Sequence, residues 1–312
     1  MSDTQPESLA AETWLAEDAD RYLVRRGDAD YPELLGQIGD PPGELYVRGD
    51  PGALHLPALA IVGSRNPTRG GARNAYEFAR FLGASGFVIV SGLAQGVDTA
   101  AHEGALAAGA QTVAFLGHGI DRVYPAANRD LARKIARQGA VVSEFPVGTP
   151  PMRELFPQRN RLISGLSLGT LVVEAARRSG SLITARLAGE QGREVFALPG
   201  SIHNPLARGC HRLIRDGAKL VESAEDIINE LGAIAGHVAS PPPAPVARPA
   251  SRADDDADYR RLASHIGHDP VTVDELARRS GLTIGEVSSM LLILELDGTV
   301  EKLSGGRYAL LL

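Results

Sequence analysis

A basic segment that also holds an aromatic residue lies in the middle of the chain, where residues 152–165 read MRELFPQRNRLISG. The side chains in it that could contact a nucleotide are Arg153, Phe156, Arg159, Asn160 and Arg161. Guanidinium groups suit phosphate, and an aromatic ring offers a face on which a base can stack, worth about 1–3 kcal/mol. We expect a helix to begin near Arg159 and to aim its amides and the arginines at one anion. The alternative, an exposed arginine-rich helix start, does not explain the aromatic ring.

Three glycine- or serine-rich loops read GSRNPTRGG at 63–71, SGLAQGVDTAAH at 91–102 and EAARRSGSLITA at 174–185. The first and the third could hold further phosphate on backbone amides at a helix start, and the glycines of the second permit close backbone approach. Their candidate binding residues are Gly63, Ser64, Arg65, Gly92, Gly96, Ser179, Gly180, Ser181 and Thr184. The alternative for each loop is a tight turn with an ordinary helix cap.

The chain carries no complete catalytic constellation. It lacks the G-x-G-x-x-G and G-x-x-x-x-G-K-[ST] patterns at its strand ends, which disfavours nicotinamide and P-loop nucleotides. Glu144 and Glu174 follow strands without a nearby nucleophile, and we expect them to hold loop arginines. A single cysteine, Cys210, excludes a disulfide framework and a cysteine-based zinc cluster. We therefore expect a binding protein rather than an enzyme, with no cofactor and no metal.

The elements that must position these residues alternate along the middle of the chain. Apolar runs recur at 58–63, 87–92, 111–117, 140–145, 170–175, 194–199 and 218–222, and helical patterns lie between them at 72–82, 98–108, 129–138 and 181–191. Continuous apolar strands that alternate with helices indicate a parallel sheet covered on both faces. We predict an α/β fold, an extended Rossmann-like, doubly wound parallel sheet.

The two ends of the chain differ from this middle part. Residues 1–57 form a short acidic segment, residues 58–235 the sheet domain, residues 236–258 a Pro/Ala-rich linker, and residues 259–312 a compact unit. That last unit is predicted to be a winged helix, because it contains a helix at 274–281, a second helix at 284–298 and a hairpin around Gly305.

Charge is divided unevenly between these parts. Residues 1–57 carry a net charge of −8, residues 58–236 carry +5 and residues 237–312 carry −3. The basic middle leaves a polyanion partner open despite the overall charge of −6. No apolar run is long enough for a membrane span, the N-terminus does not read as a signal peptide, and we expect a cytoplasmic protein.

Seven segments in order resemble the DprA/Smf family: YPELLGQIGDPPGELYVRG, AIVGSRNPTRGG, VIVSGLAQGVDTAAHEGALAAGAQTVAFLGHGIDRVYP, SEFPVGTPP, FPQRNRLISGLS, VVEAARRSGSLITARLAGEQGREVFALPG and GCHRLIRDGA. The resemblance covers about residues 31–222 and extends to the winged helix. It implies a protein of natural transformation that binds incoming single-stranded DNA without sequence preference, protects it and helps to load RecA. It also implies a homodimer formed through the later part of the sheet domain, and no catalysis.

Carried over by motif, the resemblance places DNA contacts at Arg65, Arg153, Phe156, Arg159, Asn160 and Arg161. The chain departs from the family pattern in its short N-terminal segment, where we expect a small helical SAM-like domain to be reduced or missing. It departs again in the second helix of the winged helix, where residues 284–296 hold no Lys or Arg, so we expect no duplex binding by that helix. A nucleotide-binding enzyme of phosphoribohydrolase type, with Glu174 as its carboxylate, is the rival interpretation.

Overall fold

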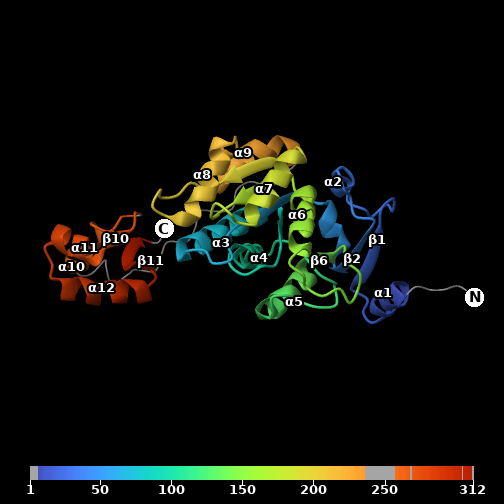
Figure 1. Ribbon diagram of the computed structural model, residues 1–312, viewed down its shortest axis with the longest axis horizontal. Coiled ribbons are helices and arrows are strands. Elements are labelled where there is room, and N and C mark those ends of the chain that lie inside the picture. The colour runs from blue at the N-terminus through green and yellow to red at the C-terminus, as the bar shows by residue number, and fades with distance from the viewer. Residues whose placement is uncertain (1–5, 236–256, 268, 304, 311–312) are drawn as a thin grey trace, which may run out of the picture. The chain divides into compact units, whose positions relative to one another are not determined.

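A computed structural model of the chain describes residues 6–235, 257–267, 269–303 and 305–310 (Figure 1). The described residues form two compact units, a larger one made of most of residues 6–235 and a smaller one made of those from 257 onward. None of the helices in the described ranges has the length and apolar character needed to cross a membrane.

The larger unit is built on a nine-stranded sheet with the order β1-β2-β6-β5-β4-β3-β7-β8-β9. The strands are β1 (Arg21–Arg25), β2 (Glu44–Gly49), β3 (Ala58–Val62), β4 (Val88–Ser91), β5 (Thr112–Phe115), β6 (Ala140–Ser143), β7 (Gly169–Val172), β8 (Glu194–Ala197) and β9 (Lys219–Leu220). Strands β3 to β9 are parallel to one another, whereas β2 pairs antiparallel with β6 and β1 pairs antiparallel with β2. The predicted doubly wound parallel sheet is confirmed.

Helices cover both faces of this sheet (Figure 1). They are α1 (Pro6–Ala16), α2 (Glu33–Gly36), α3 (Arg69–Ala84), α4 (Val97–Ala107), α5 (Arg129–Gln138), α6 (Leu155–Leu166), α7 (Ser181–Glu190), α8 (Arg208–Arg215) and α9 (Ala224–Ala235), with short 3-10 turns at Pro51–His55, Ala126–Asn128 and Pro205–Ala207. Helices α2, α6, α7 and α8 pack on one face, while α3, α4, α5 and α9 pack on the other. Every residue of β3, β4, β5, β6 and β7 is buried, which explains their continuous apolar runs.

The N-terminal segment belongs to the larger unit, so the boundary predicted at residue 57 falls inside that unit. Strand β2 pairs with β6 and buries Leu45 and Val47, and α1 sets Trp14 edge-on to Tyr46 with 5.9 Å between ring centroids. The segment therefore extends the sheet instead of preceding it.

The smaller unit contains α10 (Ala257–Ala263), β10 (Val271–Thr272), α11 (Val273–Ser280), α12 (Ile284–Leu296), β11 (Val300–Leu303) and β12 (Arg307–Leu310). The three strands pair in the order β10-β12-β11 around a core of its own that includes Leu262, Leu276 and Leu291. The predicted winged helix is confirmed. Helix α10 begins inside the predicted linker, and residues 236–256 of that linker lie outside the described residues.

Candidate nucleic-acid interface

The candidate site lies where the strand order of the sheet reverses. The parallel part of the sheet begins at β3; the chain adds β4, β5 and β6 on one side of β3 and then returns to add β7, β8 and β9 on the other. The loops that follow β3 and β7 diverge at this point, and such switch points are where open α/β sheets bind ligands.

A cavity of about 720 Å³ opens there, which we call the switch-point cavity. It is lined by Val62, Gly63, Ser64, Arg65, Asp98, Tyr124, Arg153, Phe156, Pro157, Arg159, Asn160, Ile163, Ala176, Arg178, Ser179, Gly180, Ser181, Ile183 and Thr184. These residues come from the β3 loop, the start of α4, the start of α6 and the loop that leads from β7 into α7.

The β3 loop presents Arg65 to the cavity. The Ser64 carbonyl accepts a hydrogen bond from the Val97 amide at 3.1 Å, and the Ser64 hydroxyl accepts one from the Asn66 amide at 3.1 Å. These bonds fix the backbone on both sides of Arg65. Its guanidinium carbon lies 5.7 Å from the centroid of the Phe156 ring, a cation–π distance, and its side chain is exposed.

Two aromatic rings form one wall of the cavity. The centroids of Tyr124 and Phe156 lie 5.8 Å apart with the rings tilted by 40°, and half of Tyr124 is exposed. Gly117 gives Phe156 its room, since a Cβ on Gly117 would lie 2.7 Å from the Phe156 ring. The pair leaves aromatic surface available for a flat apolar partner such as a base.

Below the aromatic wall, Arg159 connects α6 to the strand ends. Its side chain is only 4% exposed, and its Nη1 donates to the Gly92 carbonyl at 2.7 Å and to the Phe115 carbonyl. Burial lowers the pKa of Arg159 to about 10, although the nearby Asp98 carboxylate opposes that fall. Arg159 is therefore charged at neutral pH; its Nη1 is used by two backbone carbonyls, whereas its buried Nε has no hydrogen-bond partner among the described residues.

Asp98 is the buried counter-charge to Arg159. Its carboxylate accepts hydrogen bonds from the amides of Gly92 at 3.1 Å and Ala94 at 3.3 Å. Burial raises the pKa of Asp98, and the Arg159 charge together with those two amides works against the rise. The pair joins the loop after β4 to α4 and α6 and gives the cavity a rigid floor.

The loop before α7 supplies amides and hydroxyls. The hydroxyls of Ser179 and Ser181 lie 2.7 Å apart, and the Ser181 amide donates to Ser179 Oγ at 3.3 Å. Helix α7 begins at Ser181, and the positive end of its dipole faces the cavity that Gly180 and Ser181 line. Such an end favours a phosphate.

Most of the predicted site residues come together in this cavity. It unites Gly63, Ser64, Arg65, Arg153, Phe156, Arg159, Asn160, Ser179, Gly180, Ser181 and Thr184. Gly92 and Gly96 do not line it and lie behind it instead. A Cβ on Gly92 would lie 2.3 Å from Arg159 Nη1, and one on Gly96 would lie 2.5 Å from the Ser64 carbonyl oxygen.

Arg161 does not reach the switch-point cavity. It pairs with Glu144, with 2.6 Å between Nη1 and Oε1, and its Nε lies 3.2 Å from the Asp40 carboxylate. The expectation of a helix start near Arg159 is wrong, because α6 already begins at Leu155. Two residues along a helix turn the side chain by about 200°, so Arg159 and Arg161 cannot face one anion.

Arg178 is the functional candidate that sequence reasoning missed. It lines the cavity, is exposed and has no hydrogen-bond or ion-pair partner in the described parts of the chain. The signal was present, because Arg177 and Arg178 directly precede the Ser179 loop. Arg65 and Arg153 are likewise exposed and unpaired within the described ranges.

Neither candidate carboxylate lines this cavity. Glu144 holds Arg161, as expected. Glu174 is 7% exposed, with its carboxylate packed so closely on Gly71 that an added Cβ there would lie 2.4 Å away. Within the described residues no group of three or more His, Cys, Asp or Glu side chains could hold a metal ion.

Two family models match the chain. The model for DNA recombination-mediator protein A matches residues 22–232, and the model for the DprA winged helix domain matches residues 242–306. Protein Smf of Escherichia coli K12 is 43% identical over 94% of this chain and 78% of its own length. DNA processing protein DprA of Streptococcus pneumoniae R6 is 47% identical over 64% of this chain and 71% of its own length.

Solved structures agree with these matches. The X-ray structure of DprA from Streptococcus pneumoniae superposes with a TM-score of 0.66 at 44% identity, over 70% of this chain and 77% of that chain. DprA from Helicobacter pylori, described for its unique single-stranded DNA binding mode, superposes with a TM-score of 0.62 at 32% identity, over 69% of this chain and 96% of that chain. By its sheet, its winged helix and these matches, the chain belongs to the DNA recombination-mediator protein A family, which includes DprA and Smf proteins.

Proposed function

We propose that the chain binds single-stranded DNA without sequence preference in the switch-point cavity, and that it acts there as a recombination mediator. The observation that carries this proposal is the grouping of three exposed arginines, Arg65, Arg153 and Arg178, around the rings of Tyr124 and Phe156, none of them in a side-chain hydrogen bond or ion pair within the described residues. Guanidinium groups without an acidic partner remain available for phosphates. A neighbouring pair of aromatic rings remains available for bases.

The chemistry of the cavity fits a single strand better than a duplex. Stacking on Phe156 requires a base whose face is free, and bases of a duplex are already stacked on each other. The arginines and the amides of the α7 start contact phosphate oxygens, which are the same in every nucleotide. Affinity should therefore depend on salt and little on sequence.

The wider role rests on the same chemistry. A strand held through its phosphates is kept extended and shielded from nucleases, which supports protection of incoming DNA and the loading of RecA. We propose that this takes place in the cytoplasm and that the protein acts as a homodimer, since two cavities on one strand gain avidity without new contacts. The exposed Leu220 on the edge strand β9 supports a dimer face in the later part of the sheet domain.

The test measures fluorescence anisotropy of labelled oligo-dT and of a matched duplex at two salt concentrations. Arg65→Ala/Arg153→Ala should weaken binding to single strands of every sequence, and the slope of log K against log salt should fall by about 0.7 for each lost contact. Arg133→Ala is the control, because that α5 arginine pairs with Asp130 outside the cavity. Wild-type protein that fails to bind oligo-dT at low salt would contradict the proposal.

A further inference from the structure

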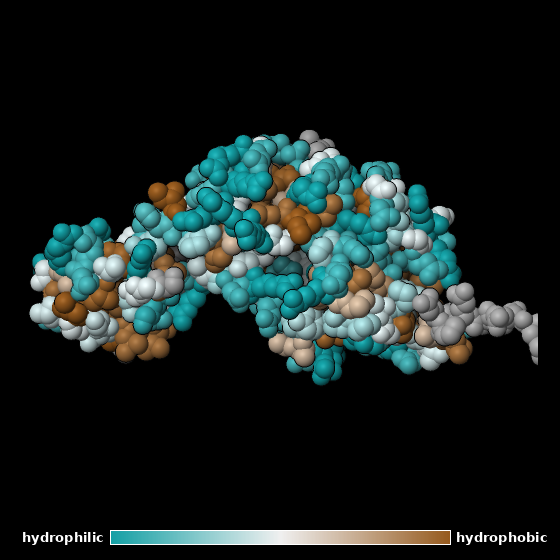
Figure 2. Space-filling view, viewed as in Figure 1, coloured by the Kyte–Doolittle hydropathy of each residue, from teal (hydrophilic) through white to brown (hydrophobic). Residues whose placement is uncertain are grey.

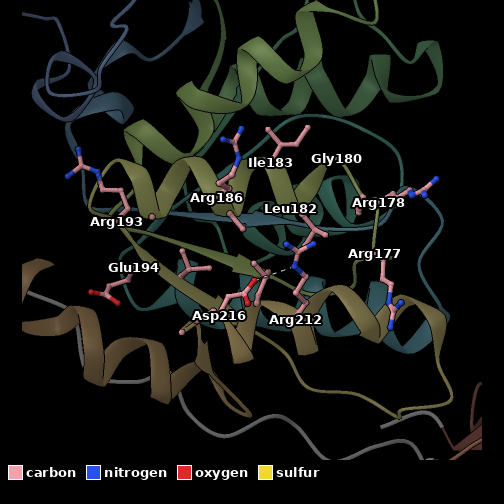
Figure 3. A pocket seen from close by; sticks show the side chains of 17 residues that line it. Arg177, Arg178, Gly180, Leu182, Ile183, Arg186, Arg193, Glu194, Arg212 and Asp216 are labelled. Atoms are coloured by element: carbon pink, nitrogen blue, oxygen red, sulfur yellow. Dashed lines mark hydrogen bonds and ion pairs between the residues drawn. The ribbon is translucent and has the colours of Figure 1, made fainter.

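A second cavity, of about 700 Å³, lies between α7 and α8, and we call it the α7–α8 groove (Figure 3). Its lining residues are Arg177, Arg178, Ser179, Gly180, Leu182, Ile183, Ala185, Arg186, Gly189, Arg193, Glu194, Val195, Arg212, Leu213, Asp216, Gly217 and Ala218. Five of these are arginines and two are acidic, so the groove carries an excess of positive charge. Of these five arginines, only Arg178 also lines the switch-point cavity.

The groove and the switch-point cavity adjoin each other. Arg178, Ser179, Gly180 and Ile183 line both spaces. The two cavities therefore meet at the start of α7, with the unpaired Arg178 at the junction. A chain molecule bound in the first cavity can leave it across this junction and enter the second.

The arginines of the groove are available to an incoming anion. Arg177 is exposed and has no ion-pair partner in the described part of the chain. Arg186 pairs with Glu190 at 2.9 Å and Arg212 with Asp216 at 3.3 Å, and each pair joins two exposed side chains one helical turn apart. Exposed pairs of this kind are weak because water screens both charges, so a phosphate can replace the carboxylate at small cost.

Arg193 closes the groove at its other end. Its Nη2 donates to the Leu34 carbonyl at 3.2 Å, and partial burial lowers its pKa. Between Arg178 and Arg193 runs α7, whose ten residues span about 15 Å. Positive side chains thus accompany the whole length of this helix, as Figure 3 shows for Arg178, Arg186 and Arg193.

The rest of the lining indicates what kind of contact the groove makes. Its apolar residues are aliphatic, with Leu182, Val195 and Leu213 among them, and no aromatic ring lines it. It therefore offers no stacking platform for bases. What it offers to a nucleic acid is phosphate contact, which is independent of sequence.

We infer that the α7–α8 groove is a second subsite for the same single strand, which leaves the switch-point cavity over Arg178 and continues along α7 with its phosphates on Arg177, Arg186 and Arg212. The inference rests on the proposed function, because it extends the path of a strand already bound in the first cavity. The first cavity holds phosphates and bases, whereas the second holds phosphates alone. An acidic protein segment is the other occupant that the charge would suit, but the shared lining favours the polymer that the first cavity already holds.

The test compares oligo-dT of about 6 nucleotides, short enough for the first cavity, with oligo-dT of about 20 nucleotides. Arg186→Ala/Arg212→Ala in the full chain should leave the short oligonucleotide unaffected. On the long one, the salt slope should fall by about 1.4, which corresponds to two lost phosphate contacts. Arg186→Lys/Arg212→Lys should keep the slope, and Arg215→Ala, an exposed α8 arginine outside the groove, should behave as wild type.

The variants are compared on the same long oligonucleotide, so bridging between two protomers affects all of them alike. Unchanged long-oligonucleotide binding by Arg186→Ala/Arg212→Ala would overturn the inference while the proposed function stands. Loss of poly-Glu binding in that variant, with DNA affinity kept, would also overturn it and assign the groove to an acidic protein segment. Wild-type protein that binds neither oligonucleotide would overturn the proposed function itself.

Discussion

At the scale of single residues, the shape of the switch-point cavity depends on residues that do not line it. Gly96 has a φ of +83°, and an added Cβ would lie 2.5 Å from the Ser64 carbonyl oxygen and 2.6 Å from that of Arg65. The close approach presses the β3 loop onto the start of α4, which holds Arg65 in place. Glycine at this position is thus a positioning residue, although it lies behind the binding surface.

Phe156 should contribute much of the single-stranded DNA affinity that remains at high salt concentration. Phe156→Ala in the proposed site should weaken oligo-dT binding by about 1–3 kcal/mol, or about 5- to 150-fold, because base stacking is lost while the phosphate contacts remain. The salt slope should stay near the wild-type value, and Phe156→Tyr should retain most of the affinity. Titration by anisotropy checks both, and a changed slope with unchanged low-salt affinity would contradict this role.

Replacing Arg159 by alanine should affect mainly the stability of the protein, whereas replacing Arg161 should leave DNA binding near wild type. Arg159→Ala removes the donor to the buried Gly92 and Phe115 carbonyls and should cost about 1–3 kcal/mol of unfolding free energy for each carbonyl left without a donor. Arg161→Ala leaves DNA binding near wild type, because Arg161 faces Glu144 and Asp40. Urea unfolding together with oligo-dT titration distinguishes the two. Loss of DNA affinity in a stably folded Arg161→Ala protein would contradict this prediction and show that Arg161 contributes to DNA binding.

His102 makes the protein sensitive to acid. Its Nδ1 lies 2.7 Å from the Thr112 hydroxyl, which itself lies 2.6 Å from the Ile89 carbonyl, so the ring donates through Nδ1 and leaves Nε2 without a partner. Burial, with the Arg159 charge, lowers the pKa of His102 from 6.5 to about 3. At a pH between these two pKa values, His102 is protonated in the unfolded chain but neutral in the folded protein. Stability is therefore complete above the unfolded pKa and falls as pH drops.

The expected loss from this one group is about 1.4 kcal/mol for each pH unit below 6.5. His102→Gln should flatten that part of the stability profile, since glutamine can donate to Thr112 without binding a proton. Urea unfolding at several pH values from 7 down to 4 checks it. If the unfolding free energy of the variant and of the wild type fell equally with pH, groups other than His102 would control the loss of stability in acid.

At the scale of elements, α12 has the place of a recognition helix without the usual charge. It contains no Lys or Arg, and Glu286 is used in a capping box with Thr283. Ile284, Leu292 and Leu296 are exposed on it, and Figure 2 shows apolar surface over this part of the smaller unit. On α11, Arg278 and Arg279 both pair with Glu275. Helix α12 thus presents an apolar rather than a basic surface, and the two arginines of α11 are already paired.

The isolated segment 257–312 should therefore fail to bind duplex DNA at physiological salt. It has a core of its own, so its folding can be verified by circular dichroism before the titration. Without basic side chains on α12, little counterion release drives binding. The intact chain with oligo-dT serves as the positive control. Tight duplex binding by the folded segment would contradict this interpretation.

The sequence predicted the parallel strands because each is buried on both faces and therefore reads as an unbroken apolar run. It predicted the switch-point loops because glycine and serine gather where strands end. It did not predict that α6 starts at Leu155, since the start lacks a side-chain cap. It did not separate Arg159 from Arg161 either, because helical phase follows from that start. The place of residues 21–49 depends on pairing with β6, a distant partner that no local pattern names.

At the scale of the whole molecule, the uneven charge of the sequence has a structural counterpart. The acidic N-terminal segment extends the sheet at the β1–β2 edge, whereas the basic side chains of the switch-point cavity and the α7–α8 groove gather around the start and length of α7. A net charge of −6 repels polyanions at long range, and the local basic surface attracts them at short range. A higher salt concentration screens both effects, and it should weaken the contacts of the bound complex more than it raises the rate of association.

The pairing of β2 with β6 also orders events during translation. Glu44–Gly49 leaves the ribosome long before Ala140–Ser143 has been made, so the β1–β2 ribbon first exists with its β2 edge still open and with Leu45 and Val47 uncovered. A two-stranded ribbon alone is marginally stable in water, and an open edge can pair with other chains. The β1–β2 ribbon therefore waits for a partner strand that is synthesised about 90 residues later, and its β2 edge stays exposed to misassembly until β6 has been made.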